Sequence, residues 1–202
     1  QLFPAEQVTG GMREYLRWQN NCLSPRDLAS DIYLEAPFTH PSVAFRRDTV
    51  TALGGYRDGV FPEDYDLWLR INAAGLEMRK LSATLLSWRL HPKSLSRRDG
   101  RYSRSAFDAL RAKYLSVDPR LTSGRDVVVW GAGRRTRARF KHAASAGVRP
   151  CAWIDVNPRK LGNRLEGAPV VPPAWLRFRS QRPLVLVYVA NHGVRDKVGQ
   201  YL

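Results

Sequence analysis

The order of elements in the second half of the chain constrains its fold most strongly. The apolar run 126–130 predicts a short strand, the glycine-rich run 131–133 predicts a tight turn, and residues 137–146 predict a helix. A second apolar run, 150–154, predicts another strand. Parallel strands need a crossover of this length, whereas antiparallel neighbours can be joined by a short turn. The sequence therefore predicts a βαβ unit and an α/β fold.

The glycine turn carries part of a dinucleotide-binding fingerprint. Gly131 and Gly133 follow the first strand, and Asp155 ends the second strand 22 residues after Gly133, close to the usual position of a ribose-binding acid. Thr136 stands where a third glycine or alanine is normal. Arg134 and two further arginines surround a helix N-terminus, which favours anions. We expect Gly131, Gly133, Arg134 and Asp155 to bind a nucleotide or phosphate; the alternative is that the glycines only form the turn.

The remainder of this half continues the pattern. Residues 155–162 and 166–171 resemble Rossmann-like modules attached to bacterial sugar-processing enzymes. A later strand at 184–190 leads into a turn at 191–195, at the expected carboxyl edge of the sheet. The sequence predicts a small Rossmann-like parallel-sheet domain over 124–202, which we expect to be truncated. It shows no partner for hydride transfer, so a bound nucleotide is favoured over catalytic NAD chemistry.

Three carboxylates occupy four positions in the first half. Glu63, Asp64 and Asp66 follow Pro62 directly and precede an apolar stripe of helical period over 67–74. Proline near a helix start and acids in its first turn complement the helix dipole. Taken alone, this cluster fits a structural helix start as well as a functional site.

The blocks on either side of the cluster favour function. In their order and separation, four blocks resemble the second half of family 2 glycosyltransferases, which are inverting enzymes with an A-type nucleotide-sugar fold. These blocks are 39–47 (THPSVAFRR), 53–59 (LGGYRDG), 61–70 (FPEDYDLWLR) and 87–97 (SWRLHPKSLSR). The resemblance covers about residues 35–115. It implies transfer of a sugar from a nucleotide diphosphate sugar to a saccharide or lipid-linked acceptor.

Inverting transfer requires a base that takes the acceptor hydroxyl proton and positive charge on the departing diphosphate. By the resemblance, Asp64 is the expected base, and Glu63 is expected to contact the acceptor or to tune the site. Trp68 is a candidate for stacking on a sugar or nucleotide, although its interpretation as a core aromatic is favoured.

The basic loop after residue 88 is a candidate for diphosphate binding. In related A-type enzymes a histidine in this region approaches the metal or diphosphate, so His91 is the expected ligand of a divalent metal, Mn²⁺ or Mg²⁺. Arg89 and Arg97 are expected to bind substrate phosphates as the loop closes. The alternative is a solvated basic loop.

Two short strands are expected beside these motifs, at 42–45 and 83–88. His40 precedes the first of them, and Pro41 restricts it to extended geometry. His40 is therefore a further, weaker candidate for substrate binding.

The donor-binding half of such an enzyme is not visible in this sequence. Family 2 enzymes begin with a hydrophobic strand and later carry an Asp-x-Asp that holds metal and sugar diphosphate. Neither precedes residue 35, and the chain's own Asp-x-Asp, Asp64–Asp66, lies inside the acceptor-side motif. We expect residues 1–118 to be the acceptor and catalytic-base part of a transferase domain in a longer protein. The chain alone is then expected to be inactive.

Composition agrees with a division into two domains. The chain is 44% hydrophobic, and residues 1–118 carry a net charge of +3 whereas residues 119–202 carry +12. This basicity suits nucleotide phosphates, an anionic membrane surface or nucleic acid. The scattered arginines and the absence of known nucleic-acid motifs disfavour nucleic acid. Two cysteines without metal spacing, and no apolar run of about 20 residues, favour a cytoplasmic setting, with peripheral contact at the inner face of the membrane.

Two alternatives from other classes stay open. The chain could be a nucleotide- or NAD-binding regulatory or oxidoreductase module led by the second domain, in which case binding should depend on Asp155. It could also be a noncatalytic basic scaffold that binds anionic surfaces, in which case its affinity should fall steeply with salt.

Overall fold

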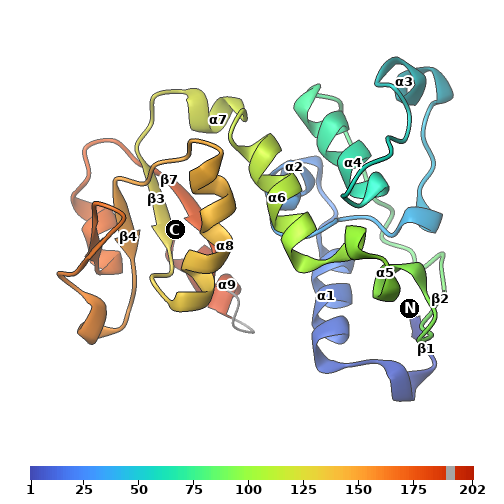
Figure 1. Cartoon of the computed structure of the whole chain (residues 1–202), viewed down its shortest axis with the longest axis horizontal. Helices are drawn as coiled ribbons and strands as arrows, with labels where there is room; N and C mark the ends of the chain where they lie inside the picture. Colours follow the sequence, from blue (N-terminus) through green and yellow to red (C-terminus); the bar gives the residue numbers. More distant parts are fainter. Residues whose placement is uncertain (190–193) are drawn as a thin grey trace. The chain divides into compact units, whose positions relative to one another are not determined.

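The computed structural model describes residues 1–189 and 194–202, and the chain divides into two compact units, Gln1–Tyr114 and Leu115–Leu202 (Figure 1). The sequence places the end of the first domain at 118 and the start of the second at 124. In the structure the segment between them forms a short helix, α7 (Pro119–Thr122), within the second unit.

The first unit is mainly helical. Thr9 caps its first long helix by accepting a hydrogen bond from the Met12 N–H at 3.2 Å, and Ser24 caps the next by accepting from the Asp27 N–H at 3.1 Å. The elements are β1 (Leu2–Phe3), α1 (Gly10–Asn21), α2 (Pro25–Asp31), α3 (Arg47–Ala52), α4 (Glu63–Ala73), β2 (Trp88–Arg89), α5 (Leu95–Arg98) and α6 (Arg104–Leu115). Single 3₁₀ turns lie at Ala5–Gln7, His40–Ser42 and Gly100–Tyr102.

The core of the first unit forms around α4. Its side chains from Tyr65 to Ile71 are all buried, and they pack with Ile32, which directly follows α2, and with residues of α3 and α6. The Tyr65 hydroxyl donates to the carbonyl of Ile32, which ties α4 to the end of α2. The clustered core residues are Ile32, Val50, Tyr65, Leu67, Trp68, Leu69, Ile71, Leu110 and Tyr114. The first turn of α4 is therefore carried by the most buried helix of this unit.

Two strands expected in this unit differ from the structure. Residues 43–46 form no strand. His40, expected to precede that strand, is instead the first residue of a 3₁₀ turn. Of the run 83–88 only Trp88 is in a strand, β2, which pairs in parallel with β1. A strand requires a neighbour that bonds to its backbone, and in the described part of this unit β1 supplies that neighbour for two residues.

The second unit is an α/β domain. Its parallel strands are joined by helices and turns, and one hairpin lies at the edge of the sheet. After α7 the elements are β3 (Val127–Trp130), α8 (Arg134–Ser145), β4 (Ala152–Ile154), β5 (Arg164–Leu165), β6 (Ala168–Val171), β7 (Leu184–Val187) and α9 (Val194–Tyr201). The α/β class predicted from the sequence is confirmed.

The sheet order is β5-β6-β4-β3-β7, with β6, β4, β3 and β7 parallel and β5 antiparallel to β6. Strand β3 therefore has β4 on one side and β7 on the other. In open α/β sheets such a point, where the order reverses, is where ligands bind, outside the carboxyl ends of the strands. The glycine turn follows β3 at this position. The turn predicted at 191–195 falls mostly on residues 190–193, which lie outside the described residues.

Helices α8 and α9 cover opposite faces of the sheet. Successive side chains of a strand point to opposite faces. Val128, Trp130, Ala152 and Ile154 cluster with Val198 of α9. On the other face Trp153 meets Phe140 of α8 edge to face, with ring centroids 5.0 Å apart. A sheet covered on both faces explains why β3 and β4 are apolar throughout.

Candidate active site

The first turn of α4 presents two of its three carboxylates at a partly buried position. Pro62 is the N-cap residue, and Glu63 and Asp64 are the first two helical residues. Both are partly buried, and the Oδ1 atom of Asp64 accepts a hydrogen bond from the Tyr65 N–H at 2.7 Å. The helix dipole favours negative charge at this end of α4. The sequence prediction of a helix that starts at this acidic run is confirmed.

The third carboxylate, Asp66, belongs to the interior. It is 1% exposed, and its two oxygens accept hydrogen bonds from Arg70 Nε at 2.8 Å and from the Tyr114 hydroxyl at 2.7 Å. Asp66 and Arg70 form a buried ion pair one helical turn apart. Asp64 and Asp66 therefore have different surroundings, and the Asp-x-Asp sequence does not form a pair of ligands at one site.

Arg70 also fixes the glycine turn that follows α3. Its two terminal nitrogens donate to the carbonyls of Leu53 at 2.7 Å and Gly55 at 2.6 Å. Gly54 and Gly55 have φ values of 85° and 63°, in the left-handed region that side chains disfavour. The two glycines allow the turn and Arg70 anchors it to α4, which holds the next residue, Tyr56, in place.

Charged and aromatic groups surround Asp64. Burial raises the pKa of its carboxyl, and the negative charge of Glu63 adds to this, while the Tyr65 N–H and the charge of His40 oppose it. Burial also raises the pKa of Tyr56, and the charges of Asp64 and Glu63 raise it further. The rings of His40 and Tyr56 lie 4.9 Å apart. The structure thus brings His40 and Tyr56 into the surroundings of the two carboxylates.

Tyr102 is a site residue that the sequence analysis did not single out. Its hydroxyl lies 2.9 Å from both carboxylate oxygens of Glu63 and donates to that carboxylate. Burial raises the pKa of Tyr102, and the hydrogen bond and charge of Glu63 raise it further. The residues are 39 positions apart and follow no motif, so their contact depends on the tertiary fold.

Trp68 lies in the hydrophobic core of the first unit and not on the surface beside Glu63 and Asp64. It is 3% exposed, and its ring meets Phe38 edge to face with centroids 5.7 Å apart. Its Nε1 atom is buried and has no hydrogen-bond partner among the described residues. The core interpretation favoured from the sequence agrees with this burial.

A cavity of about 600 Å³ lies beside the core of the first unit, and both Trp68 and Phe38 line it. Lys80 lines it as well, with its ammonium donating to the carbonyls of Gln19 and Pro37, both at 2.6 Å. Burial lowers the pKa of Lys80 to about 8. Through these two hydrogen bonds Lys80 links its own segment, which follows α4, to the end of α1 and to the backbone at Pro37.

The expected metal and diphosphate residues lie on the surface. Arg89, His91 and Arg97 are all exposed, and the carbonyl of His91 accepts hydrogen bonds from the N–H and hydroxyl of Ser94. Across residues 1–189 and 194–202, no three or more His, Cys, Asp or Glu side chains gather as a metal site would require. The donor set around His91 therefore does not fit a metal by itself.

The glycine turn of the second unit is tightly packed. Gly131 has a φ of 114°, and a Cβ at this position would lie 2.9 Å from Thr136 Oγ1 and from Val189 Cγ1. Thr136 is buried and stands where the fingerprint has a third small residue. The missing Cβ of Gly131 makes room for Thr136, which explains how this departure from the pattern is accommodated.

Asp155 is engaged by its own domain. Its Oδ2 atom accepts from the Ala132 N–H at 2.9 Å and from Lys160 Nζ at 2.8 Å, and its Oδ1 atom accepts from the Asn157 N–H at 2.9 Å. Burial raises the pKa of Asp155, but these three hydrogen bonds outweigh it and hold the pKa below its ordinary value. A ribose hydroxyl at this carboxylate would have to share it with Lys160. The expected Arg134 is the first residue of α8 and is exposed.

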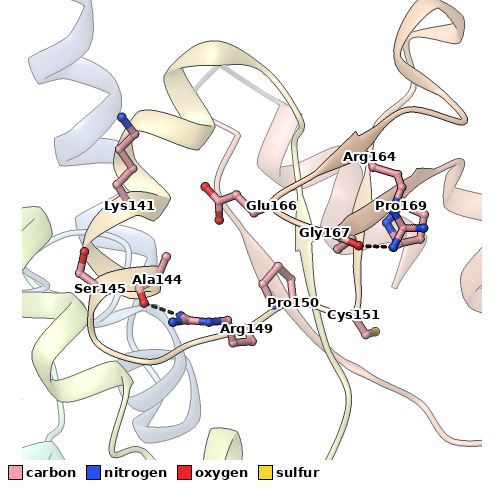
Figure 2. A pocket seen from close by; sticks show the side chains of 11 residues that line it. Lys141, Ala144, Ser145, Arg149, Pro150, Cys151, Arg164, Glu166, Gly167 and Pro169 are labelled. Carbon is pink, nitrogen blue, oxygen red and sulfur yellow. Dashed lines mark hydrogen bonds between the residues drawn. The ribbon is translucent and has the colours of Figure 1, made fainter.

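A second hollow of about 770 Å³ lies at the other end of the same sheet (Figure 2). It is lined by the end of α8, the segment that leads into β4 and the β5–β6 turn, so it lies at the amino ends of β4 and β6. Arg149 donates to the carbonyl of Ala144, and Arg164 donates to the carbonyl of Gly167 (Figure 2). Both arginines thus brace their own loops.

Part of the chain is similar to bacterial glycosyltransferases. It is 34% identical over 92 residues to the amylovoran biosynthesis glycosyltransferase AmsE of Erwinia amylovora. The matched region covers 45% of this chain and 35% of that protein. It is 38% identical over 76 residues to the O-antigen biosynthesis glycosyltransferase WbnJ of Escherichia coli, covering 37% and 30% of the two chains.

A third relative, the UDP-Gal:alpha-D-GlcNAc-diphosphoundecaprenol beta-1,3-galactosyltransferase of Escherichia coli, is 35% identical over 86 residues. That match covers 40% of this chain and 31% of the relative. The chain thus spans about a third of the length of the curated relatives that it matches. Each of these three relatives is named as a glycosyltransferase or galactosyltransferase.

No family model matches the chain, and no solved structure matches it. Both cysteines, Cys22 and Cys151, are free thiols. In the described part of the chain, none of the helices combines the length and apolar character needed to cross a membrane.

Proposed function

We propose that this chain supplies the acceptor side and the catalytic base of an inverting glycosyltransferase that acts on a nucleotide diphosphate sugar. The observation that carries this proposal is the first turn of α4, where Asp64 is partly buried beside Glu63, His40 and Tyr56. The similarity to glycosyltransferases supports it independently of the geometry. Asp66, which is paired with Arg70, is excluded from the catalytic role by its burial.

In the proposed reaction Asp64 is the general base. The acceptor O–H bond breaks as its proton moves to the carboxylate of Asp64, and the acceptor oxygen forms a bond to the anomeric carbon of the donor. The bond from that carbon to the diphosphate oxygen breaks on the opposite face, so configuration inverts and the nucleoside diphosphate leaves. Burial raises the pKa of Asp64, and a carboxylate of higher pKa accepts this proton more readily.

Glu63 is proposed as the acceptor-binding partner of Asp64. The hydrogen bond from Tyr102 occupies part of its carboxylate, so Glu63 is held in one orientation beside the base. The carboxylate of Glu63 is proposed to accept a hydrogen bond from a second hydroxyl of the acceptor sugar. It also disfavours ionisation of Asp64, which contributes to the raised pKa.

The diphosphate leaving group requires positive charge. Arg89, the exposed last residue of β2, and Arg97, in the exposed segment that follows, are proposed to supply it. A divalent metal, Mn²⁺ or Mg²⁺, is also proposed for the whole enzyme, but the described residues around His91 do not fit a metal on their own. We propose that the donor and its metal are held chiefly by a donor-binding half outside these 202 residues. A cytoplasmic setting, with contact at the inner membrane face, is part of this proposal.

The test is sugar transfer by the full-length product of the gene. The donor and acceptor named for the third relative, UDP-galactose and N-acetylglucosaminyl diphosphoundecaprenol, provide the first pair of substrates to try. If these are inactive, other UDP- and dTDP-sugars follow with the same acceptor. The anomeric configuration of the product, read by NMR, should be inverted relative to the donor. A product that retains the donor configuration would contradict the proposed single displacement.

A nucleotide-binding role for the second unit is a second candidate. The observation that favours it is Lys160, whose ammonium lies 3.7 Å from the place that a Cβ of Gly133 would occupy. A cation at the glycine turn suits a phosphate better than the ribose expected from the fingerprint. Calorimetric titration with ADP and with NAD tests this role. Saturable binding that weakens in Lys160→Ala supports it, and indifference to both ligands contradicts it.

A further inference from the structure

We propose that the rings of Tyr56, His40 and Phe45 form a platform that binds the pyranose ring of an acceptor sugar beside Asp64. The inference rests on the proposed function, because it names the class of acceptor for the same carboxylates. It also assigns a binding role to Tyr56 and Phe45, which neither the motif nor the relatives' names provide.

The three rings form an exposed aromatic row. Tyr56 is 41% exposed and Phe45 is 46% exposed. The ring centroids of His40 and Tyr56 lie 4.9 Å apart, and those of Phe45 and Tyr56 lie 6.4 Å apart. His40 and Phe45 come from the block 39–47 and Tyr56 from the turn after α3, so the row is completed by the tertiary fold. Clustered exposed apolar surface of this kind marks a binding site.

Tyr56 is held in place from the buried side. The turn that carries it requires left-handed glycines at Gly54 and Gly55, and Arg70 donates to the carbonyls on both sides of Gly54. Arg70 is itself fixed by the buried carboxylate of Asp66. A backbone turn anchored in this way loses little conformational entropy when a ligand stacks on the ring that the turn carries.

The charges beside the platform favour a neutral saccharide. Asp64 and Glu63 are close enough to Tyr56 for their charges to raise the pKa of its hydroxyl. Two carboxylates repel the phosphates of a nucleotide, whereas they accept hydrogen bonds from sugar hydroxyls. A pyranose has an apolar C–H face that packs on an aromatic ring and hydroxyls around its edge. In the proposed arrangement one face of the sugar packs on Tyr56, and hydroxyls at its edge are directed toward the two carboxylates.

The experiment measures sugar binding by the 202-residue chain. The probes are the methyl pyranosides of galactose, glucose and N-acetylglucosamine, studied by saturation-transfer difference NMR. At least one of them should show saturation of its ring C–H protons. Tyr56→Ala should weaken that binding about tenfold, as loss of an aromatic contact does, while Tyr56→Phe should retain it. Phe178→Ala is the matched control, since Phe178 is an exposed aromatic of the second unit.

Phe45→Ala provides a second test of the same platform if Tyr56→Ala fails to fold. Its side chain is exposed, so its removal should weaken the probe without unfolding the chain. No saturation of any probe in the unaltered chain, or saturation in both alanine variants that equals that of the unaltered chain, overturns the proposal. Because binding requires no sugar transfer, these results are separate from those on the role of Asp64. Loss of the platform with Asp64 still essential would leave the proposed function standing.

Discussion

At the scale of single residues, Asp64 and Asp66 show how burial assigns different roles to neighbouring carboxylates. Asp66 is satisfied by Arg70 and Tyr114 inside the core, whereas Asp64 is partly buried beside His40 and Tyr56. A buried charge without its partner is costly, so Asp66 and Arg70 depend on each other. The motif places both acids on one helix, but only Asp64 lies where a ligand could reach it.

Removal of one member of the buried pair should destabilise the first unit. Asp66→Asn leaves Arg70 charged and buried, and we expect a loss of about 3–5 kcal/mol in the free energy of unfolding. Urea denaturation followed by circular dichroism measures it. Asp48→Asn is the matched control, because the Arg46–Asp48 pair is fully exposed and should change stability little. Equal effects from the two variants would contradict the structural role of Asp66.

The raised pKa of Asp64 predicts a gain in stability when its charge is removed. Because the folded-state pKa lies above the unfolded value, ionisation of Asp64 costs stability as pH rises through that folded pKa. Asp64→Asn should therefore be more stable than the unaltered chain at pH 7. The difference should vanish well below pH 4, near the ordinary pKa of about 3.9, where both states carry a protonated carboxyl. A variant that is less stable at pH 7 would show that the charge is favourable in the fold.

At the scale of elements, local signals account for the helices. Glu63 begins α4 directly after a proline, and α8 begins directly after Gly133. In both helices the C-cap residue is an alanine that is followed by glycine, so local sequence signals the end of each helix. Helix α8 starts three residues before the expected 137, because it begins directly after Gly133. The expected strands at 42–45 and 83–88 depend on pairing partners, which no local pattern reveals. The contacts of Tyr56 and Tyr102 depend in the same way on distant segments.

Tyr102 is expected to order the basic segment that precedes it. Its hydrogen bonds to Glu63 tie residues 91–103 to the start of α4, and this segment contains the trypsin sites Arg97 and Arg98. Tyr102→Phe removes these bonds and should accelerate tryptic cleavage in the segment. Mass spectrometry of the early fragments measures the rate. Tyr56→Phe serves as the control and should leave cleavage unchanged.

Gly131 sets the geometry of the β3–α8 turn. In Gly131→Ala the new Cβ meets Thr136 and Val189 at 2.9 Å, in a left-handed backbone conformation. Backbone strain and overpacking together should cost about 2–5 kcal/mol in the free energy of unfolding. Gly199→Ala is the control, because Gly199 lies within α9 and a Cβ there meets nothing within 4 Å. Alanine in a helix is favoured over glycine, so this variant should be slightly more stable.

At the scale of the whole molecule, the chain combines two units of different charge. Each unit has its own hydrophobic core, one around α4 and one around the parallel sheet. The change in composition near residue 118 indicated this division, because it separates a nearly balanced segment from one with a net charge of +12. The boundary between the units, after Tyr114, falls before the last residue of α6, and no glycine or proline marks it in the sequence.

Separate cores predict separate unfolding. Differential scanning calorimetry should resolve two transitions, and each destabilising variant should move one of them. Asp66→Asn should lower the transition of the first unit, and Gly131→Ala should lower the other. One cooperative transition that both variants lower equally would contradict independent cores.

The most direct measurement of the central claim is the rate of sugar transfer by Asp64→Asn in the full-length protein. Loss of a general base typically costs a factor of about 10² to 10⁴, and we expect a decrease in kcat of that size. Circular dichroism should show an unchanged fold, and Asp58→Asn, an exposed acid just ahead of the site, should retain full activity. Transfer by Asp64→Asn at the unaltered rate would remove Asp64 from the role of base and overturn the account.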